Sequence, residues 1–255
     1  MFIGIETPNE ESLRETHKRQ NLGIDLIAQI QRFVEEGIAV VGGMIIGFDS
    51  DGPGIFEHQY EFAMSSPIAC FTLGALLAPD ATPLRTRLQS ENRLSNTGGV
   101  GAKMSPWETN IIPTQMSQQM LYDGLRWLAN QLYAPTAFGD RLLFLLETFG
   151  QKSTVAPPQK QMERTVDLDV FKVVHKLPRL GEAEAEMFRR VTAAVAEKPA
   201  AQGVAMSMLF RYMQIRYMYE RGHLWEPRLA EQVLPTLTSE DVTRTATIPL
   251  VASTG

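Results

Sequence analysis

Two glycines and a carboxylate stand at or near the ends of apolar runs, and they are the clearest candidates for ligand chemistry. Glu6 ends the first apolar run, and Gly43 and Gly47 lie in the second, Ile38–Phe48. A carboxylate at a strand end could accept hydrogen bonds from a ligand ammonium or hydroxyl group. Glycines there let a flat ring or a sugar approach the backbone, and Ile45 between them could pack against that ring.

Each feature also has an ordinary structural explanation. Glu6 could serve only to begin the next helix, which is the commoner role of a carboxylate at such a place. Helix packing alone explains the glycines of the second run as well as a ligand does. The spacing of these residues therefore indicates a binding site only when the three runs are considered together.

The first 90 residues have the rhythm of βα units. A third apolar run, Cys70–Ala78, leads into Pro79–Leu84, and the nearly continuous apolarity of the second run is typical of a parallel strand covered on both faces. Helices are predicted over Ile24–Glu36, over Ile55–Met64 and from Pro83, with Thr82 as N-cap. In βα barrels the ligand chemistry gathers at the carboxyl ends of the strands, where Glu6 and Gly47 would lie.

The remainder of the chain reads as helical after a polar crossing loop, Asn92–Ser117. Helices are predicted over Met116–Ala134, Phe138–Phe149, Thr165–Lys176, Gly181–Ala196 and Ala201–Arg221, with a linker at Gln151–Gln161 and 30 loose residues at the end. The predicted fold class is α/β and then all-α: a partial parallel βα barrel, last strands only, followed by a helical extension. The expected divisions are residues 1–90, 91–150 and 151–255.

Composition narrows the classes of function. A net charge of −5 with scattered Lys and Arg argues against a nucleic-acid partner. The apolar runs are too short for a membrane span, and the N-terminus lacks the pattern of a signal peptide. A single cysteine, Cys70, allows neither an intrachain disulfide nor a cysteine-rich metal centre. We therefore expect a cytoplasmic protein with no membrane span.

Taken in order, three motifs resemble strands four to six of radical S-adenosylmethionine enzymes. They are Ile3–Thr7, Gly43–Phe48 and Pro79–Leu84. More narrowly, they resemble the cobalamin-binding-domain branch, which includes hopanoid methylases and relatives of the anaerobic magnesium-protoporphyrin monomethyl ester cyclase. The runs Trp107–Pro113 and Met120–Pro135 are similar to the helical extension that follows the barrel in that branch.

The resemblance implies a set of cofactor-binding residues: Glu6, Thr7, Gly43, Ile45, Gly47, Ser50 and Leu77. The first two would lie near the methionyl and ribose part of S-adenosylmethionine. The glycines and Ile45 would line its adenosine side, and Leu77 with its neighbours would flank the adenine. Ser50 stands where the family pattern has an acidic residue, with Asp49 and Asp51 on either side.

The family's cofactors, by this resemblance, are S-adenosylmethionine, a [4Fe–4S] cluster and cobalamin. The cluster needs three cysteines in a CxxxCxxC loop, which this sequence lacks, so no metal ligands are assigned and the catalytic residues stay unknown. We expect a fragment that starts at an internal methionine or is a split or decayed remnant. The complete enzyme would form a 5′-deoxyadenosyl radical and act on an unactivated carbon of a small-molecule, lipid-like or tetrapyrrole substrate, by methyl transfer or ring closure.

Two other classes of function stay open. The chain could be a non-catalytic remnant or a partner-dependent interaction protein, because a partial barrel exposes an unpaired strand edge. It could also be an ordinary βα-barrel enzyme with another cofactor, although only three βα units are evident against the eight of a full barrel.

A few further side chains allow both a structural and a functional interpretation. Arg85 and Arg87 could meet an anionic substrate, but a solvated helix face is the favoured explanation. His58 is expected on a helix surface rather than in a metal site, and Cys70 as a small buried residue rather than a nucleophile.

Overall fold

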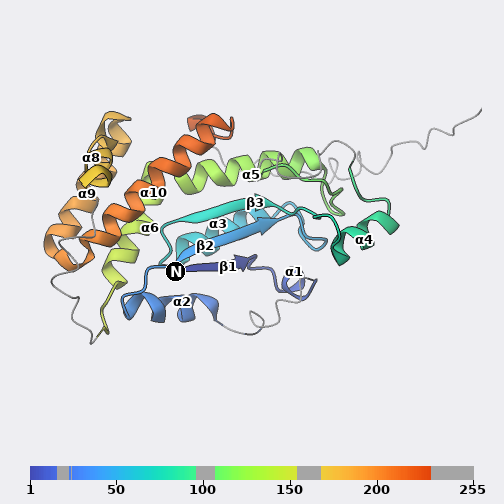
Figure 1. Ribbon diagram of the computed structural model, residues 1–255, viewed down its shortest axis with the longest axis horizontal. Helices are drawn as coiled ribbons and strands as arrows, with labels where there is room; N and C mark the ends of the chain where they lie inside the picture. The colour runs from blue at the N-terminus through green and yellow to red at the C-terminus, as the bar shows by residue number, and fades with distance from the viewer. Residues whose placement is uncertain (16–22, 24, 96–106, 154–167, 231–255) are drawn as a thin grey trace, which may run out of the picture.

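The computed structural model describes residues 1–15, 23, 25–95, 107–153 and 168–230. Strands β1 (Phe2–Glu6), β2 (Val41–Ile46) and β3 (Phe71–Ala75) form a parallel sheet in the order β1-β2-β3 (Figure 1). The predicted parallel βα arrangement is confirmed. Each strand is shorter than its apolar run, because the flanking apolar residues enter or leave the sheet through turns.

Four helices accompany the sheet: α1 (Glu10–Glu15), α2 (Leu26–Glu35), α3 (Ile55–Ser65) and α4 (Pro83–Ser90). Helix α2 begins two residues later than predicted, because the Asp25 side chain accepts the Ala28 N–H at 2.9 Å and so caps it. Gly37, with φ +84°, follows its end in the left-handed conformation that glycine readily adopts after a helix. Thr82 caps α4 and Pro83 opens it, which confirms that prediction.

The second part of the described chain is helical, as predicted. It contains α5 (Gln118–Tyr133), α6 (Pro135–Thr148), α8 (Leu168–Val174), α9 (Glu182–Glu197) and α10 (Gln202–Arg221), with short 3-10 turns at Leu177–Arg179, Pro199–Ala201 and Pro227–Ala230. Helix α5 runs along the sheet, whereas α8, α9 and α10 gather beyond the amino ends of the strands (Figure 1).

Two predictions on the helical part concern the start of α6 and the segments that follow it. Helix α6 begins at Pro135 and not at Phe138, because proline is well suited to the first turn of a helix, where its missing N–H needs no partner. Most of the predicted linker, with Pro157 and Pro158, and the last 25 residues lie outside the described residues.

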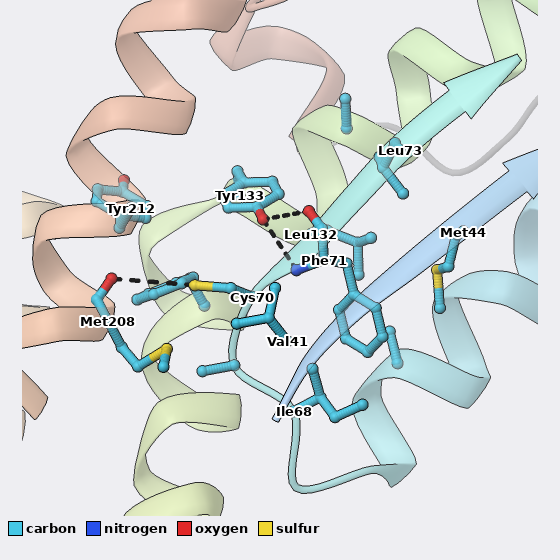
Figure 2. Packing of buried hydrophobic residues seen from close by; sticks show 14 of the residues in the cluster. Val41, Met44, Ile68, Cys70, Phe71, Leu73, Leu132, Tyr133, Met208 and Tyr212 are labelled. Atoms are coloured by element: carbon cyan, nitrogen blue, oxygen red, sulfur yellow. Dashed lines mark hydrogen bonds between the residues drawn. The ribbon is translucent and has the colours of Figure 1, made fainter. Parts of the chain in front are cut away.

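One apolar core runs from the sheet into the helices (Figure 2). The Tyr133 hydroxyl donates to the Phe71 carbonyl at 2.6 Å and accepts the Phe71 N–H at 3.1 Å, which fixes the end of α5 to the start of β3. The Cys70 thiol points toward the Met208 carbonyl of α10 at 4.0 Å. Burial raises the pKa of Cys70 to about 12, so the cysteine is a small core residue, as expected.

Candidate functional site

The structure brings the ends of the three parallel strands to one edge of the sheet. Glu6 is the last residue of β1 and has a positive φ of 65°, and Gly47 follows β2 directly. Leu77 lies two residues beyond β3. Since neighbouring parallel strands end side by side, all three of these predicted site residues share that edge. Helices α1 and α4 lie at the same end of the sheet (Figure 1).

One face of the sheet carries three glycines, Gly4, Gly43 and Gly74. Gly4 pairs with Gly43, and Ile45 pairs with Gly74 one step nearer the carboxyl edge. Ile45 is half-buried, whereas the next residue, Ile46, has 0% exposure on the opposite, helix-covered face. On this open face the Phe2 ring lies over Gly43, with its Cζ 2.7 Å from a Cβ built there, and Thr72 Oγ1 is 3.5 Å from the same point. The part of the face that a planar ring could use is therefore the part nearer the carboxyl edge, where Ile45 pairs with Gly74.

Gly47 forms a tight turn where β2 leaves the sheet. Its φ of +113° is a conformation that L side chains rarely adopt. A Cβ built at this position would lie 3.2 Å from Cδ2 of Leu121 in α5 and 3.6 Å from Cβ of Leu76. The turn is thus packed from behind by the helical part of the chain, and its positive φ favours glycine there.

A buried polar cluster stands behind this turn. Asp51, only 1% exposed, accepts the N–H groups of Gly47 at 2.9 Å and Phe48 at 3.0 Å. Its other oxygen accepts the Ser12 hydroxyl at 2.8 Å, and the Ser12 and Ser50 hydroxyl oxygens are 2.7 Å apart. Burial raises the pKa of Asp51 more than these donors lower it.

This arrangement differs from the sequence interpretation, which placed Ser50 at the acidic position of the motif. The carboxyl group that contacts the turn belongs to the next residue, Asp51, which the motif comparison named only as a neighbour of Ser50. Thr7, another predicted site residue, is 1% exposed, and its Oγ1 accepts the Asn9 N–H at 3.2 Å at the start of α1.

Gln59 of α3 was not identified from the sequence. It is completely buried, and its Nε2 donates to the carbonyls of Glu6 at 3.3 Å and Ile45 at 3.2 Å, which joins the ends of β1 and β2. A signal was present, since Gln59 lies in the apolar stripe that also contains Phe56 and Ala63. A glutamine in such a stripe must find hydrogen-bond partners in the core.

The arginines that could have met an anionic substrate are held within the chain. Arg87 and Arg93 each approach the Asp49 carboxylate at 2.5 Å, and Arg85 pairs with Asp80 at 3.0 Å. Burial raises the pKa of Asp49, but the hydrogen bonds from the two guanidinium groups outweigh it and leave that pKa below its usual value. These contacts favour a structural role.

The run after β3 is clamped by a later segment. Asn110 accepts the Ala78 N–H at 2.9 Å and donates to the Ala78 carbonyl at 2.8 Å, and the Thr109 hydroxyl donates to the Leu76 carbonyl at 2.5 Å. Leu77 between them keeps 36% of its surface exposed. The segment with Thr109 and Asn110 thus fixes the backbone on either side of Leu77 and leaves its side chain at the surface.

The donor set does not fit an iron–sulfur cluster. Cys70 is the one cysteine of the sequence, and it lies in the core with a raised pKa. Within the part of the chain that the structure describes, no three His, Cys, Asp or Glu side chains gather as metal ligands, and His58 is exposed on α3. We therefore derive no step through a cluster bound by these residues.

Among the described helices, none is long and apolar enough to cross a bilayer.

Comparison with known proteins identifies the family. Residues 82–222, more than half of the chain, match DUF4070, a domain of unknown function, and the chain belongs to this family. That family occurs in B12-binding radical S-adenosylmethionine proteins, which confirms the resemblance inferred from the sequence motifs.

Two curated relatives agree with this assignment. A hopanoid C-2 methylase of Rhodopseudomonas palustris is 38% identical over 94 residues, which are 37% of this chain and 18% of the relative. An uncharacterized methyltransferase of Synechocystis is 33% identical over 143 residues, 55% of this chain and 26% of the relative. The chain thus spans about a fifth to a quarter of the length of these relatives. No solved structure is significantly similar to it.

Proposed function

We propose that the open face and carboxyl edge of the sheet form part of the S-adenosylmethionine-binding wall of a radical methyltransferase. The observation that carries this proposal is the half-buried Ile45, which pairs with Gly74 next to the Gly47 turn at the carboxyl edge. Family membership and the two methyltransferase relatives support it. S-adenosylmethionine would supply the reactive group, and the residues of this chain would bind and orient it.

The division of work among the residues follows from their positions. Ile45 would pack against the adenine ring, and Gly47 would let the adenosine lie close to the backbone. Gly43 would do the same once the Phe2 ring, which lies over it in this structure, is displaced. The carboxylate of Glu6, at the neighbouring strand end, would accept a hydrogen bond from the ribose hydroxyls or the methionyl ammonium group. Thr7, Ser50 and Leu77 would shape the rim of the same wall.

The rest of the reaction is proposed on the resemblance alone. The cluster and cobalamin would be held by polypeptide outside the residues described, and the substrate would be a small molecule of lipid-like or tetrapyrrole type. The reaction would modify an unactivated carbon, with methyl transfer favoured over ring closure because both relatives are named as methylating proteins.

Equilibrium dialysis of the full chain against labelled S-adenosylmethionine tests the proposal. Because the sheet supplies one wall only, we expect weak binding, with a Kd on the order of 1 mM. Ile45→Lys should abolish it by filling the open face with a cationic side chain. Leu180→Lys is the matched control, since Leu180 is 57% exposed in the helical part. Absence of binding at about ten times that Kd, or equal binding by Ile45→Lys, would contradict the proposal.

A second candidate function is association through the sheet edge. Among the described residues β1 pairs only with β2, and Met1 and Phe2 on it keep 53% and 62% of their surfaces exposed. Such an edge can take up another strand. Sedimentation velocity should then show a concentration-dependent dimer that Phe2→Lys dissociates, whereas a monomer at every concentration would exclude this candidate for the isolated chain.

A further inference from the structure

The Asp51 carboxyl group is placed to determine the shape of the turn that follows β2. One oxygen accepts two consecutive backbone N–H groups, those of Gly47 and Phe48, at 2.9 and 3.0 Å. Asp51 itself is 1% exposed, so water does not replace these bonds. Two adjacent N–H groups aimed at one oxygen set the orientation of both peptide planes, and one of these belongs to the residue with φ +113°.

The same carboxyl group reaches a second element. Its other oxygen accepts the hydroxyl of Ser12, a residue of α1 with 0% exposure, at 2.8 Å. Ser12 is also 2.7 Å from the Ser50 hydroxyl, and Asn9 donates from Nδ2 to the Ser50 carbonyl at 3.3 Å. Helix α1 follows β1 closely, so these bonds join the turn after β2 to the helix that follows Glu6.

We propose that Asp51 is a positioning residue for S-adenosylmethionine, which it would not touch: it holds the Gly47–Phe48 turn, and through Ser12 keeps that turn in register with the end of β1. This inference rests on the proposed function, because the turn matters for affinity only if the cofactor lies against it. The residue acts through backbone groups, so the side chain's role is to supply hydrogen-bond acceptors.

The test compares three variants of the full chain by amide hydrogen exchange and by S-adenosylmethionine binding. Asp51→Ala removes both acceptors, and Asp51→Asn keeps one oxygen that can accept the two N–H groups. Ser12→Ala leaves Asp51 in place and removes the hydroxyl bonds from α1 to Asp51 and Ser50. We expect Asp51→Ala to speed exchange of the Gly47 and Phe48 amides and to weaken binding, each about tenfold. Asp51→Asn should stay within about threefold of the parent in both, since its remaining oxygen restores the acceptor.

The two readouts distinguish a failure of the Asp51 positioning role from a failure of the proposed function. If the parent chain binds no S-adenosylmethionine, the proposed function fails and this inference fails with it. If the parent binds and Asp51→Ala binds equally well, or if its Gly47 and Phe48 amides stay protected, only the positioning role is overturned. Should Asp51→Ala not fold, Ser12→Ala decides: its affinity should fall about threefold, and an unchanged affinity overturns the role.

Discussion

Replacement of Gly47 by alanine is the perturbation whose outcome follows most directly from the geometry of the turn. At φ +113° an L residue incurs a backbone penalty of about 1–3 kcal/mol. The new Cβ would also lie 3.2 Å from Cδ2 of Leu121, inside ordinary van der Waals contact, and overpacking of this kind costs about 1–3 kcal/mol. We therefore expect Gly47→Ala to lower the free energy of unfolding by about 2–6 kcal/mol.

Urea unfolding followed by circular dichroism measures this loss, and the chain offers a matched control. Gly203 lies in α10 with no atom within 4 Å of a built Cβ, so Gly203→Ala should stabilise the protein by about 0.5–1 kcal/mol. A Gly47→Ala variant as stable as the Gly203→Ala control would refute the argument from the turn.

A double-mutant cycle separates the two causes. In a Leu121→Ala background the steric contact is gone, and only the backbone penalty of Gly47→Ala should remain. The two substitutions should then show a coupling of at least about 0.5 kcal/mol. Equal destabilisation by Gly47→Ala in both backgrounds would mean that Leu121 does not limit the space at the turn.

Three further predictions concern the core and the edge of the sheet. Tyr133→Phe removes both bonds to the Phe71 backbone and should cost about 1–3 kcal/mol in urea unfolding; a loss below about 0.5 kcal/mol would contradict this. Cys70 should resist iodoacetamide at pH 8 in the folded protein and react at once in urea, because burial raises its pKa to about 12; rapid labelling of the folded chain would show otherwise. The lowered pKa of Asp49 means that its ionised form stabilises the fold above its unfolded pKa of about 3.9, and that this contribution is lost as the pH falls through the lower folded value. Asp49→Asn should therefore be less stable than the parent at pH 7, with the difference shrinking below about pH 4; a constant difference would count against the ion pairs.

Local signals in the sequence were sufficient to predict the parallel sheet and the helical second part, but not every helix boundary. The apolar second run needs cover on both faces, and residues such as Thr82 and Pro83 begin a helix for reasons contained in a few neighbours. The start of α6 was predicted wrongly, since its apolar pattern begins at Phe138 although Pro135 already opens the helix. A boundary set by a single residue is easily missed when the apolar period is used to find it.

The polar contacts of the candidate site depend on residues far apart in the chain, which explains why the sequence did not reveal them. Asp51 meets Ser12 across 39 positions, and Asn110 meets Ala78 across 32. Nothing within either segment specifies its partner, because the partner is set by the pairing of β1 with β2 and by the path of the chain after β3. The strand-end positions of Glu6 and Gly47, by contrast, followed from the apolar runs alone.

The proposed function requires S-adenosylmethionine to lie against the face of β2 that carries Ile45. Ile45 and Ile46 are adjacent residues on opposite faces of that strand, one half-buried and one with 0% exposure, and their side-chain methyl groups can be labelled and followed by NMR. If the proposal is correct, addition of S-adenosylmethionine shifts the Ile45 methyl signals through the ring current of the adenine and leaves those of Ile46 in place. Unshifted Ile45 signals at cofactor concentrations that saturate binding, or equal shifts at both residues, would contradict it.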